Sequence, residues 1–460
     1  MISTVPPELT ERILALCHPK DVAAYTQTCR RAYTLVYQSS DQYLWQTLFL
    51  DYPFDDPRPP SATPPTPSTS TTTAATPSQN VDWRTKLQRR VRAESIARRD
   101  DDAGGDRREF VDVLLECIRE AAPKGPAREP SPSRPSHNIS WVTNLLTLEE
   151  SPWIKKCLRL GPLESPSPAG PLAPDIEQLR SLLSLSLDRG VGAEAPEELR
   201  LLRRMSRAYS YVLRHYVKEE DYGPFTHGCE CVNWTHVNAM ITVMTMNLRD
   251  FGVHWPKEFK PQAIVQGLEA CRPFSAPGLL KRAPRDWAGV EGQWMRIVSF
   301  CDYRDLIRFN NSGCDSNFFD DEYQEASRLL RLSLRIVSVE SDPKVLETLP
   351  DPSRPPITFG GTMRGFNSDD VLNRAIRGNV QVMKDGNIRW SYVAIYNRHD
   401  QWSSEGVQIG GACSAAGIVG AWCGAQHEQG DSTGPFWLFR AEDPRERNQT
   451  ARVQKGNQRK

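Results

Sequence analysis

Residues 379–396 read NVQVMKDGNIRWSYVAIY. On both sides of Asp385-Gly386, apolar residues alternate with polar ones, which is the pattern of a strand with one buried face. Asp-Gly provides the positive φ angles that a two-residue hairpin turn needs. The stretch therefore predicts an antiparallel β-hairpin.

Further strand signals surround this hairpin. Leucine and isoleucine alternate with arginine and serine from Leu330 to Ile336. Short apolar runs broken by glycine follow the hairpin, namely GVQIGG (406–411), GIVGAWC (417–423) and GPFWLFR (434–440). Several short antiparallel strands with glycine at the corners predict a β barrel or a β sandwich over residues 285–440.

The start of this β-rich region carries a short motif. Gly292-Gln293-Trp294 resembles the Gly-x-Trp motif of lipocalin-like (calycin) barrels. The resemblance implies that an arginine of a late strand stacks on the tryptophan, and Arg440 is placed to do so. The alternative is that Trp294 is a core residue of another β fold. We expect a substrate peptide to bind at the open end and loops of such a barrel or sandwich. Four aromatic residues either line that end or fill the core: Trp390, Tyr392, Trp402 and Trp422.

Helical periodicity dominates the preceding part of the chain. Apolar residues step by four and three from Val237 to Phe251, which predicts a helix over 235–251. We expect a helical region with Pro-rich loops over 81–284, with further helices near 83–99, 110–118, 179–187 and 199–216. Residues 53–80 are rich in Pro, Ser and Thr and predict a disordered linker, and 441–460 predict a disordered tail. The expected fold class is α+β with several domains.

Residues 1–52 predict a separate cluster of three short helices. Leu9, Ile13, Leu16 and Cys17 lie on one face of the first, which we expect to end at Pro19. The second is expected to begin near Asp21, and the third follows Ser40-Asp41. A cluster this small is at the limit of what folds without a partner, so a partner is expected.

The same residues carry a family resemblance. From Val5 to Leu48 the chain resembles an F-box, the adaptor-docking module of Skp/cullin/F-box ubiquitin ligases. The matching residues are Pro6, Pro7, Glu8, Leu9, Ile13, Leu14, Pro19, Asp21, Val22, Cys29, Arg30, Arg31, Leu44, Trp45 and Leu48. The chain departs from the family pattern at Cys17, Thr28 and Ala32, where leucine, valine and an aromatic residue are usual.

The F-box resemblance implies a function and a set of partners. It implies a substrate receptor that is not itself catalytic, which binds a Skp-type adaptor, and through it a cullin, and presents a protein substrate that the sequence does not identify. The candidate adaptor contacts are Pro6, Pro7, Leu9, Ile13, Leu14, Cys17 and Val22. Residues 291–310 and 385–411 are also similar to F-box proteins of basidiomycete fungi. The alternatives are a non-degradative F-box adaptor and a calycin-like barrel that binds a small hydrophobic ligand.

Composition and motifs argue against other classes. The 57 basic and 57 acidic residues balance, so no overall charge points to nucleic acid or to a membrane. No signal peptide is visible, and the 11 cysteines lack framework spacing, so we expect a cytoplasmic or nuclear protein. No hydrolase, P-loop or dinucleotide motif occurs, and we expect no cofactor. The stretch from His227 to His236 contains Cys229 and Cys231, but its spacing favours a loop over a metal site.

Overall fold

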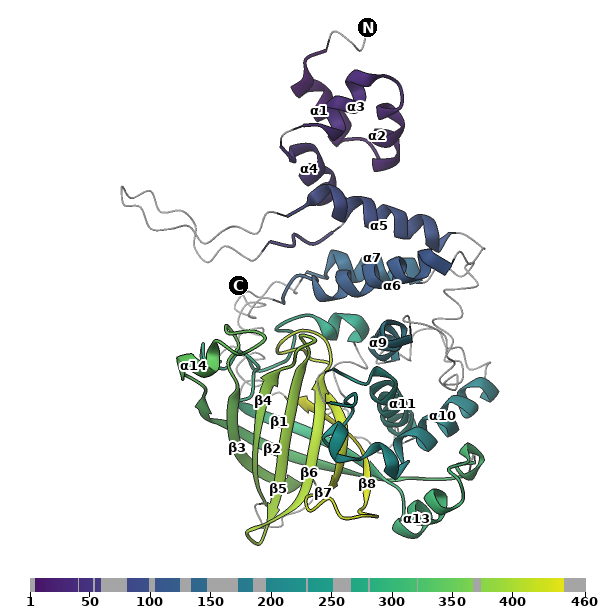
Figure 1. Cartoon of the computed structure of the whole chain (residues 1–460), viewed down its shortest axis with the longest axis vertical. Coiled ribbons are helices and arrows are strands. Elements are labelled where there is room, and N and C mark those ends of the chain that lie inside the picture. Colours follow the sequence, from purple (N-terminus) through teal and green to yellow (C-terminus); the bar gives the residue numbers. More distant parts are fainter. Residues whose placement is uncertain are drawn as a thin grey trace, which may run out of the picture. The chain divides into compact units, whose positions relative to one another are not determined.

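The computed structural model describes residues 5–39, 41–52, 54–58, 81–98, 104–124, 134–146, 173–184, 196–228, 231–250, 266–279, 282–320, 322–366 and 374–441. The chain forms two compact units. Unit 1 comprises Met1–Ala122 and Pro135–Ile154, and unit 2 comprises Pro123–Arg134 and Lys155–Lys460. The α+β class is confirmed, because unit 1 contains helices and unit 2 joins helices to a β barrel (Figure 1).

Unit 1 begins with four short helices where three were expected. They are α1 (Pro7–Ala15), α2 (Pro19–Thr26), α3 (Arg30–Tyr37) and α4 (Tyr43–Asp51). The prediction that Pro19 ends a helix was wrong, because Pro19 is the first residue of α2 and His18 caps that helix through its Nδ1 atom. Proline is well suited to a first helical position, where its missing N–H has no intrahelical acceptor.

Three longer helices complete the described part of unit 1. They are α5 (Trp83–Ala97), α6 (Gly104–Arg119) and α7 (His137–Leu146), and α7 was not predicted. The prediction of a disordered linker was wrong at Phe54 and Asp55, because both residues are buried in this unit. The Asp55 carboxylate accepts hydrogen bonds from the backbone amides of Ala122 and His137, both at 2.9 Å. Residues 56–58 of the predicted linker are exposed or half-buried. Residues 53 and 59–80 of the linker lie outside the described residues, as do 442–460 of the predicted tail.

The described part of unit 2 contains further helices before the barrel. They are α9 (Ala173–Ser184), α10 (Pro196–Ser210), η2 (Leu213–His215), η3 (Lys218–Glu220), α11 (Trp234–Asp250) and η5 (Gly267–Cys271). The helix predicted over 235–251 is confirmed as α11, which contacts α9, α10 and strands β7 (Ile418–Gly424) and β8 (Thr433–Arg440). The helices expected between 81 and 284 are therefore divided between the two units.

The β-rich region is a closed antiparallel barrel. Its strands pair in chain order, and β8 closes the barrel against β1. The other strands are β1 (Gly292–Phe300), β2 (Ala326–Val339), β3 (Ile357–Gly365), β4 (Arg374–Val382), β5 (Ile388–Tyr396) and β6 (His399–Gln408). Short helices α13 (Tyr303–Asn311) and η6 (Ser316–Phe318) lie between β1 and β2, and α14 (Pro343–Leu346) lies between β2 and β3. The predicted hairpin is confirmed, with Gly386 at φ 80° in its turn.

The two sides of the barrel wall differ in burial. Every residue of β7 and β8 is buried, because one face fills the barrel and α11 covers the other. By contrast, β2, β3 and β4 alternate buried and exposed residues, so their outer faces meet solvent. Continuous apolar runs thus mark strands covered on both sides, and alternating runs mark strands covered on one side.

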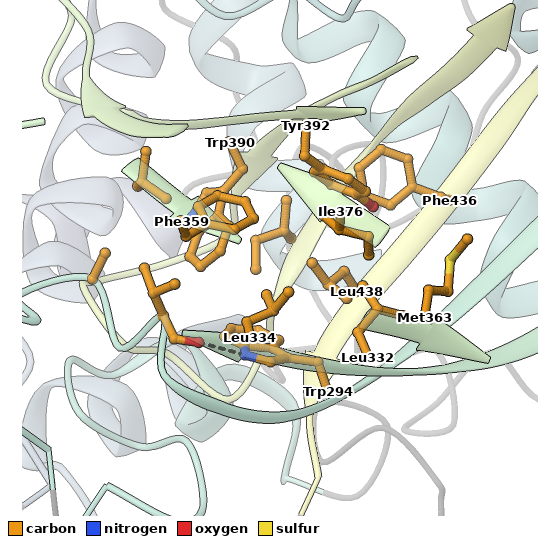
Figure 2. Close-up of a cluster of buried hydrophobic side chains, with 14 of the residues drawn as sticks. Trp294, Leu332, Leu334, Phe359, Met363, Ile376, Trp390, Tyr392, Phe436 and Leu438 are labelled. Carbon is orange, nitrogen blue, oxygen red and sulfur yellow. Dashed lines mark hydrogen bonds between the residues drawn. The ribbon is translucent and has the colours of Figure 1, made fainter. Parts of the chain in front are cut away.

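One end of the barrel, which we call the Arg440 end, is closed by Trp294 and Arg440. The Arg440 guanidinium lies over the Trp294 ring at 5.5 Å from the centroid, as predicted. Gly292 makes room for it: its φ is +140°, and a Cβ atom there would lie 2.6 Å from Arg440 Nη2. The Trp294 indole also donates a hydrogen bond to the carbonyl of Val290, drawn in Figure 2.

Candidate functional site

The first helix presents an apolar face to solvent. Leu9 is 51 % exposed, Ile13 is 58 % exposed and Leu16, which caps the helix, is 87 % exposed. Thr10, Leu14 and Ala15 form the opposite, buried face. Among the described residues, most of the exposed large apolar side chains lie between Leu9 and Leu50. A helix that is apolar on its exposed face has the pattern of a protein-binding surface.

The candidate adaptor contacts fall into three groups. Pro6, Pro7, Leu9 and Ile13 are exposed. Cys17 is half-buried, and its thiol donates to the Ile13 carbonyl at 3.3 Å. Leu14 and Val22 are buried, at 5 % and 0 % exposure, and they belong to the core beneath the exposed face. Leu16 was noted on the same helical face but was not placed among the contacts, although it is the most exposed apolar side chain there.

The exposed face rests on a well-packed core. Leu44, Trp45 and Leu48 are all buried. The Trp45 indole donates a hydrogen bond to the Val36 carbonyl at 3.1 Å, and its ring stacks on Tyr37 at 5.8 Å. These contacts join α4 to α3, so the first helices are held together from within.

Charged side chains join α5 to α6. Lys86 donates to Glu116 at 2.6 Å and to Glu120 at 2.5 Å, and Arg89 also pairs with Glu116. Arg90 is buried and contacts Glu120 at 3.1 Å. The basic sequence of α5 therefore contributes to an internal interface, which its composition alone did not reveal.

Glu94 links the first helices to α5 and α7. Its carboxylate accepts hydrogen bonds from the Tyr52 phenol at 2.7 Å and from the Trp141 indole at 2.8 Å. Burial, with help from Glu94, raises the pKa of Tyr52, so the phenol keeps its proton and remains a donor. The exposed face of α1 is thus presented by helices that are tied to the rest of unit 1.

In unit 2, aromatic rings fill the barrel interior near the Arg440 end. Trp390 and Phe359 are fully buried there, with rings 5.6 Å apart, and Trp294 lies 5.3 Å from Trp390 (Figure 2). The segment around Cys271 covers this end, because Gly411 donates its amide to the Cys271 carbonyl at 2.8 Å.

The opposite end of the barrel, which we call the Phe300 end, also has aromatic residues. Phe300, Leu330, Tyr396 and Trp402 are half-buried there and pack against the barrel core. Trp422 is buried, and its ring lies 5.1 Å from that of Trp402. Of the four aromatic residues considered in the sequence, Trp390 and Tyr392 are therefore core residues, and Trp402 and Trp422 lie at this end.

A buried ionic group lies on the outer side of β5 and β6. Glu405 accepts hydrogen bonds from Ser391 Oγ at 2.6 Å and from Arg389 Nε at 2.9 Å. Arg389 also donates to Asp221 at 2.7 Å. Burial raises the pKa of Glu405 to about 7, although Arg389 and Ser391 favour its ionised form.

The pair of Cys423 and His427 in unit 2 does not provide a reactive thiol, and the described cysteine and histidine side chains form no metal-binding group. Cys423 lies 3.3 Å from Nδ1 of His427, and burial raises the pKa of this thiol to about 12, so the reactive thiolate is scarce at neutral pH. Within the stretch considered for metal binding, His227 and Cys231 are exposed, His236 is buried in α11, and Cys229 lies outside the described residues. The described residues contain no group of three metal-ligating side chains.

The chain was compared with known proteins. No protein-family model, curated protein or solved structure matches it. None of the helices in the described part of the chain has the length and hydropathy that crossing a membrane requires.

Proposed function

We propose that this chain is the substrate-recognition subunit of an SCF-type ubiquitin ligase. The observation that supports the proposal most strongly is the exposed apolar face of α1, formed by Leu9, Ile13 and Leu16. It coincides with the part of the sequence that resembles an F-box. In this proposal a Skp-type adaptor covers that face and links the chain to a cullin.

The proposed contact set follows from burial. Pro6, Pro7, Leu9, Ile13 and Leu16 would touch the adaptor, and Cys17 would lie at the edge of the contact. Leu14 and Val22 would act indirectly, because they support α1 from below. Large apolar side chains at the centre of an interface carry most of its binding energy, which makes Ile13 the residue of greatest interest.

In this proposal unit 2 recognises the protein substrate. The chain would then work by proximity, because holding a substrate near the ubiquitin-loaded enzyme raises the effective concentration of the reactants. No catalytic residue in the chain itself is needed for this role, since the other subunits would carry out ubiquitin transfer.

Reconstitution tests the proposal. The full chain is mixed with a purified Skp-type adaptor and a cullin, and the mixture is separated by size-exclusion chromatography. We expect the three proteins to elute together. Elution of the chain with the adaptor but without the cullin would favour a non-degradative adaptor, and elution of the chain alone would overturn the proposal.

A matched pair of variants makes this test specific. Ile13→Asp places a charge on the exposed face of α1, whereas Val337→Asp places one on an equally exposed aliphatic side chain of the barrel. We expect Ile13→Asp to elute alone and Val337→Asp to elute with the complex. Equal behaviour of the two variants would mean that α1 is not the contact.

A further inference from the structure

Arg296 differs from the other buried arginines. Five arginine side chains are buried among the described residues: Arg90, Arg207, Arg272, Arg296 and Arg440. Three of them contact a carboxylate: Arg90 pairs with Glu120, Arg207 with Glu325 and Arg272 with Glu269. Arg440 donates to the backbone carbonyls of Pro277, Gly278, Gly289 and Glu291. Within the described chain, Arg296 is the buried arginine without partners of either kind.

The side chain of Arg296 points into the barrel. It is 3 % exposed, and its guanidinium carbon lies 5.2 Å from the centroid of the Tyr392 ring and 5.0 Å from that of Phe436. Figure 2 shows these two rings side by side, with Met363 nearby. One Arg296 nitrogen donates to Ser404 Oγ at 2.8 Å, and another lies 3.9 Å from the Met363 sulfur.

One polar atom at this place, Nε of Arg296, has no hydrogen-bond partner among the described residues. A guanidinium stays charged in proteins, so Arg296 cannot avoid the cost of burial by losing its proton. The two aromatic rings offset part of that cost, but a buried charge is normally paired or fully hydrogen-bonded. Among the described residues, the Arg296 guanidinium therefore has a hydroxyl and a thioether as its hydrogen-bonding neighbours and no carboxylate.

The surroundings indicate the chemistry of an anion that would pair with Arg296. A guanidinium presents parallel N–H donors that match the two oxygens of a carboxylate. The neighbouring side chains of Tyr392, Phe436 and Met363 are large and mostly apolar, so they suit a ligand whose body is apolar.

Arg296 lies between the two ends of the barrel. Along β1, Trp294 lies toward the Arg440 end and Phe300 lies at the other end. Two further guanidinium groups lie at the Phe300 end, where Arg328 is 5.2 Å from the Phe300 ring and Arg374 is 4.6 Å from the Tyr396 ring. Positive charge at this end of the barrel favours the approach of an anion.

We propose that the barrel binds a carboxylate on Arg296, with the apolar body of the ligand lying toward the Phe300 end. A free small acid and the C-terminus of a polypeptide both carry this group. The assignment does not depend on adaptor binding by unit 1, because it uses only residues of the barrel.

Calorimetric titration of the full-length protein tests the assignment. The probes are hexanoate, decanoate and phenylacetate, each compared with its uncharged amide. We expect at least one acid to bind at least about 10-fold more tightly than its amide, because only the acid forms a charge-assisted pair with Arg296. If none of the acids binds, or if acids and amides bind equally, the assignment is wrong. This comparison uses the unaltered protein and needs no variant to fold.

Two variants then locate the binding site. Arg296→Met removes the charge and keeps an apolar side chain of similar length, and Arg335→Met removes an exposed arginine from the outer face of β2. We expect Arg296→Met to abolish the preference for the acid and Arg335→Met to retain it. Retention of the full preference in Arg296→Met would place the ligand elsewhere and overturn the assignment.

A last pair of probes distinguishes the two sources of the carboxylate. One is a short peptide that ends in leucine with a free carboxylate, and the other is the same peptide with a C-terminal amide. Tighter binding of the free peptide than of decanoate would identify a polypeptide terminus as the ligand, and the reverse order would identify a small acid. Either order of affinity supports a carboxylate site, provided that Arg296→Met abolishes the preference for the carboxylate over the amide.

Discussion

Ile13 and Leu14 are neighbours in α1 and lie in opposite environments. Ile13 is 58 % exposed, whereas Leu14 is 5 % exposed and packs in the core of unit 1. Both are apolar, so hydrophobicity alone does not explain why one of them lies in solvent. The proposed docking of an adaptor would cover the exposed isoleucine.

Alanine substitution should separate these two neighbours. We expect Leu14→Ala to lower the free energy of unfolding by about 2–5 kcal/mol, because it leaves a cavity. Ile13→Ala should change it by about 0.5 kcal/mol or less, since the side chain is largely exposed. Hydrogen exchange of peptides from α1 to α4, measured by mass spectrometry, reports stability in this region. Equal effects of the two substitutions would show that Ile13 belongs to the core.

Arg440 should be irreplaceable by lysine. Its guanidinium covers the Trp294 ring and donates to four backbone carbonyls, and an ammonium group cannot reach all four in the same geometry. We expect Arg440→Lys to destabilise the barrel by about 2–4 kcal/mol, because it leaves buried carbonyls without donors. Urea unfolding followed by tryptophan fluorescence measures this loss. A loss of less than about 1 kcal/mol would contradict the role given to Arg440.

Removing one partner of the buried pair of Arg207 and Glu325 should destabilise the protein more than replacing both partners with apolar residues. Their side chains are 1 % and 0 % exposed, with Nη2 and Oε2 2.8 Å apart. We expect Glu325→Gln to lower the free energy of unfolding by about 3–5 kcal/mol, because it leaves the arginine charge unpaired. The double variant Arg207→Met/Glu325→Leu should recover much of this loss. A double-mutant cycle in urea tests the pair, and additive effects would show that the two residues are not coupled.

Glu405 should make the stability of the barrel depend on pH. Its pKa in the folded state is raised to about 7, above the ordinary value of about 4.3. Between these values the folded protein binds the proton more strongly, so the free energy of unfolding should fall as the pH rises, by about 1–3 kcal/mol. Urea unfolding at several pH values should show this slope in the wild type. Glu405→Gln should remove it, and the exposed control Glu347→Gln should keep it.

Local patterns predicted much of the fold. Asp385-Gly386 identified its hairpin because the turn requires those residue types, and the spacing from Val237 onward identified α11. The contact of Arg440 with Trp294 followed from a motif and a late arginine. The hairpin and α11 are determined by residues that are neighbours in the sequence, whereas the contact of Arg440 with Trp294 joins distant residues and was implied by the resemblance.

Features that depend on tertiary contacts were missed. Asp55 and Arg296 are charged residues that the fold buries, and nothing next to them in the sequence marks them as buried. In α1 both faces are apolar, so periodicity could not tell the exposed Ile13 from the buried Leu14. Burial had to be known before the candidate contacts could be divided into surface and core.

The affinity of the full chain for a purified Skp-type adaptor tests the central proposal most directly. Biolayer interferometry would compare the wild type with Ile13→Asp and with Val337→Asp. We expect Ile13→Asp to bind roughly 30- to 1000-fold more weakly, as expected for loss of an interface hot spot, and Val337→Asp to bind like the wild type. Failure of the folded wild-type chain to bind the adaptor, or equal binding by Ile13→Asp, would contradict the proposal.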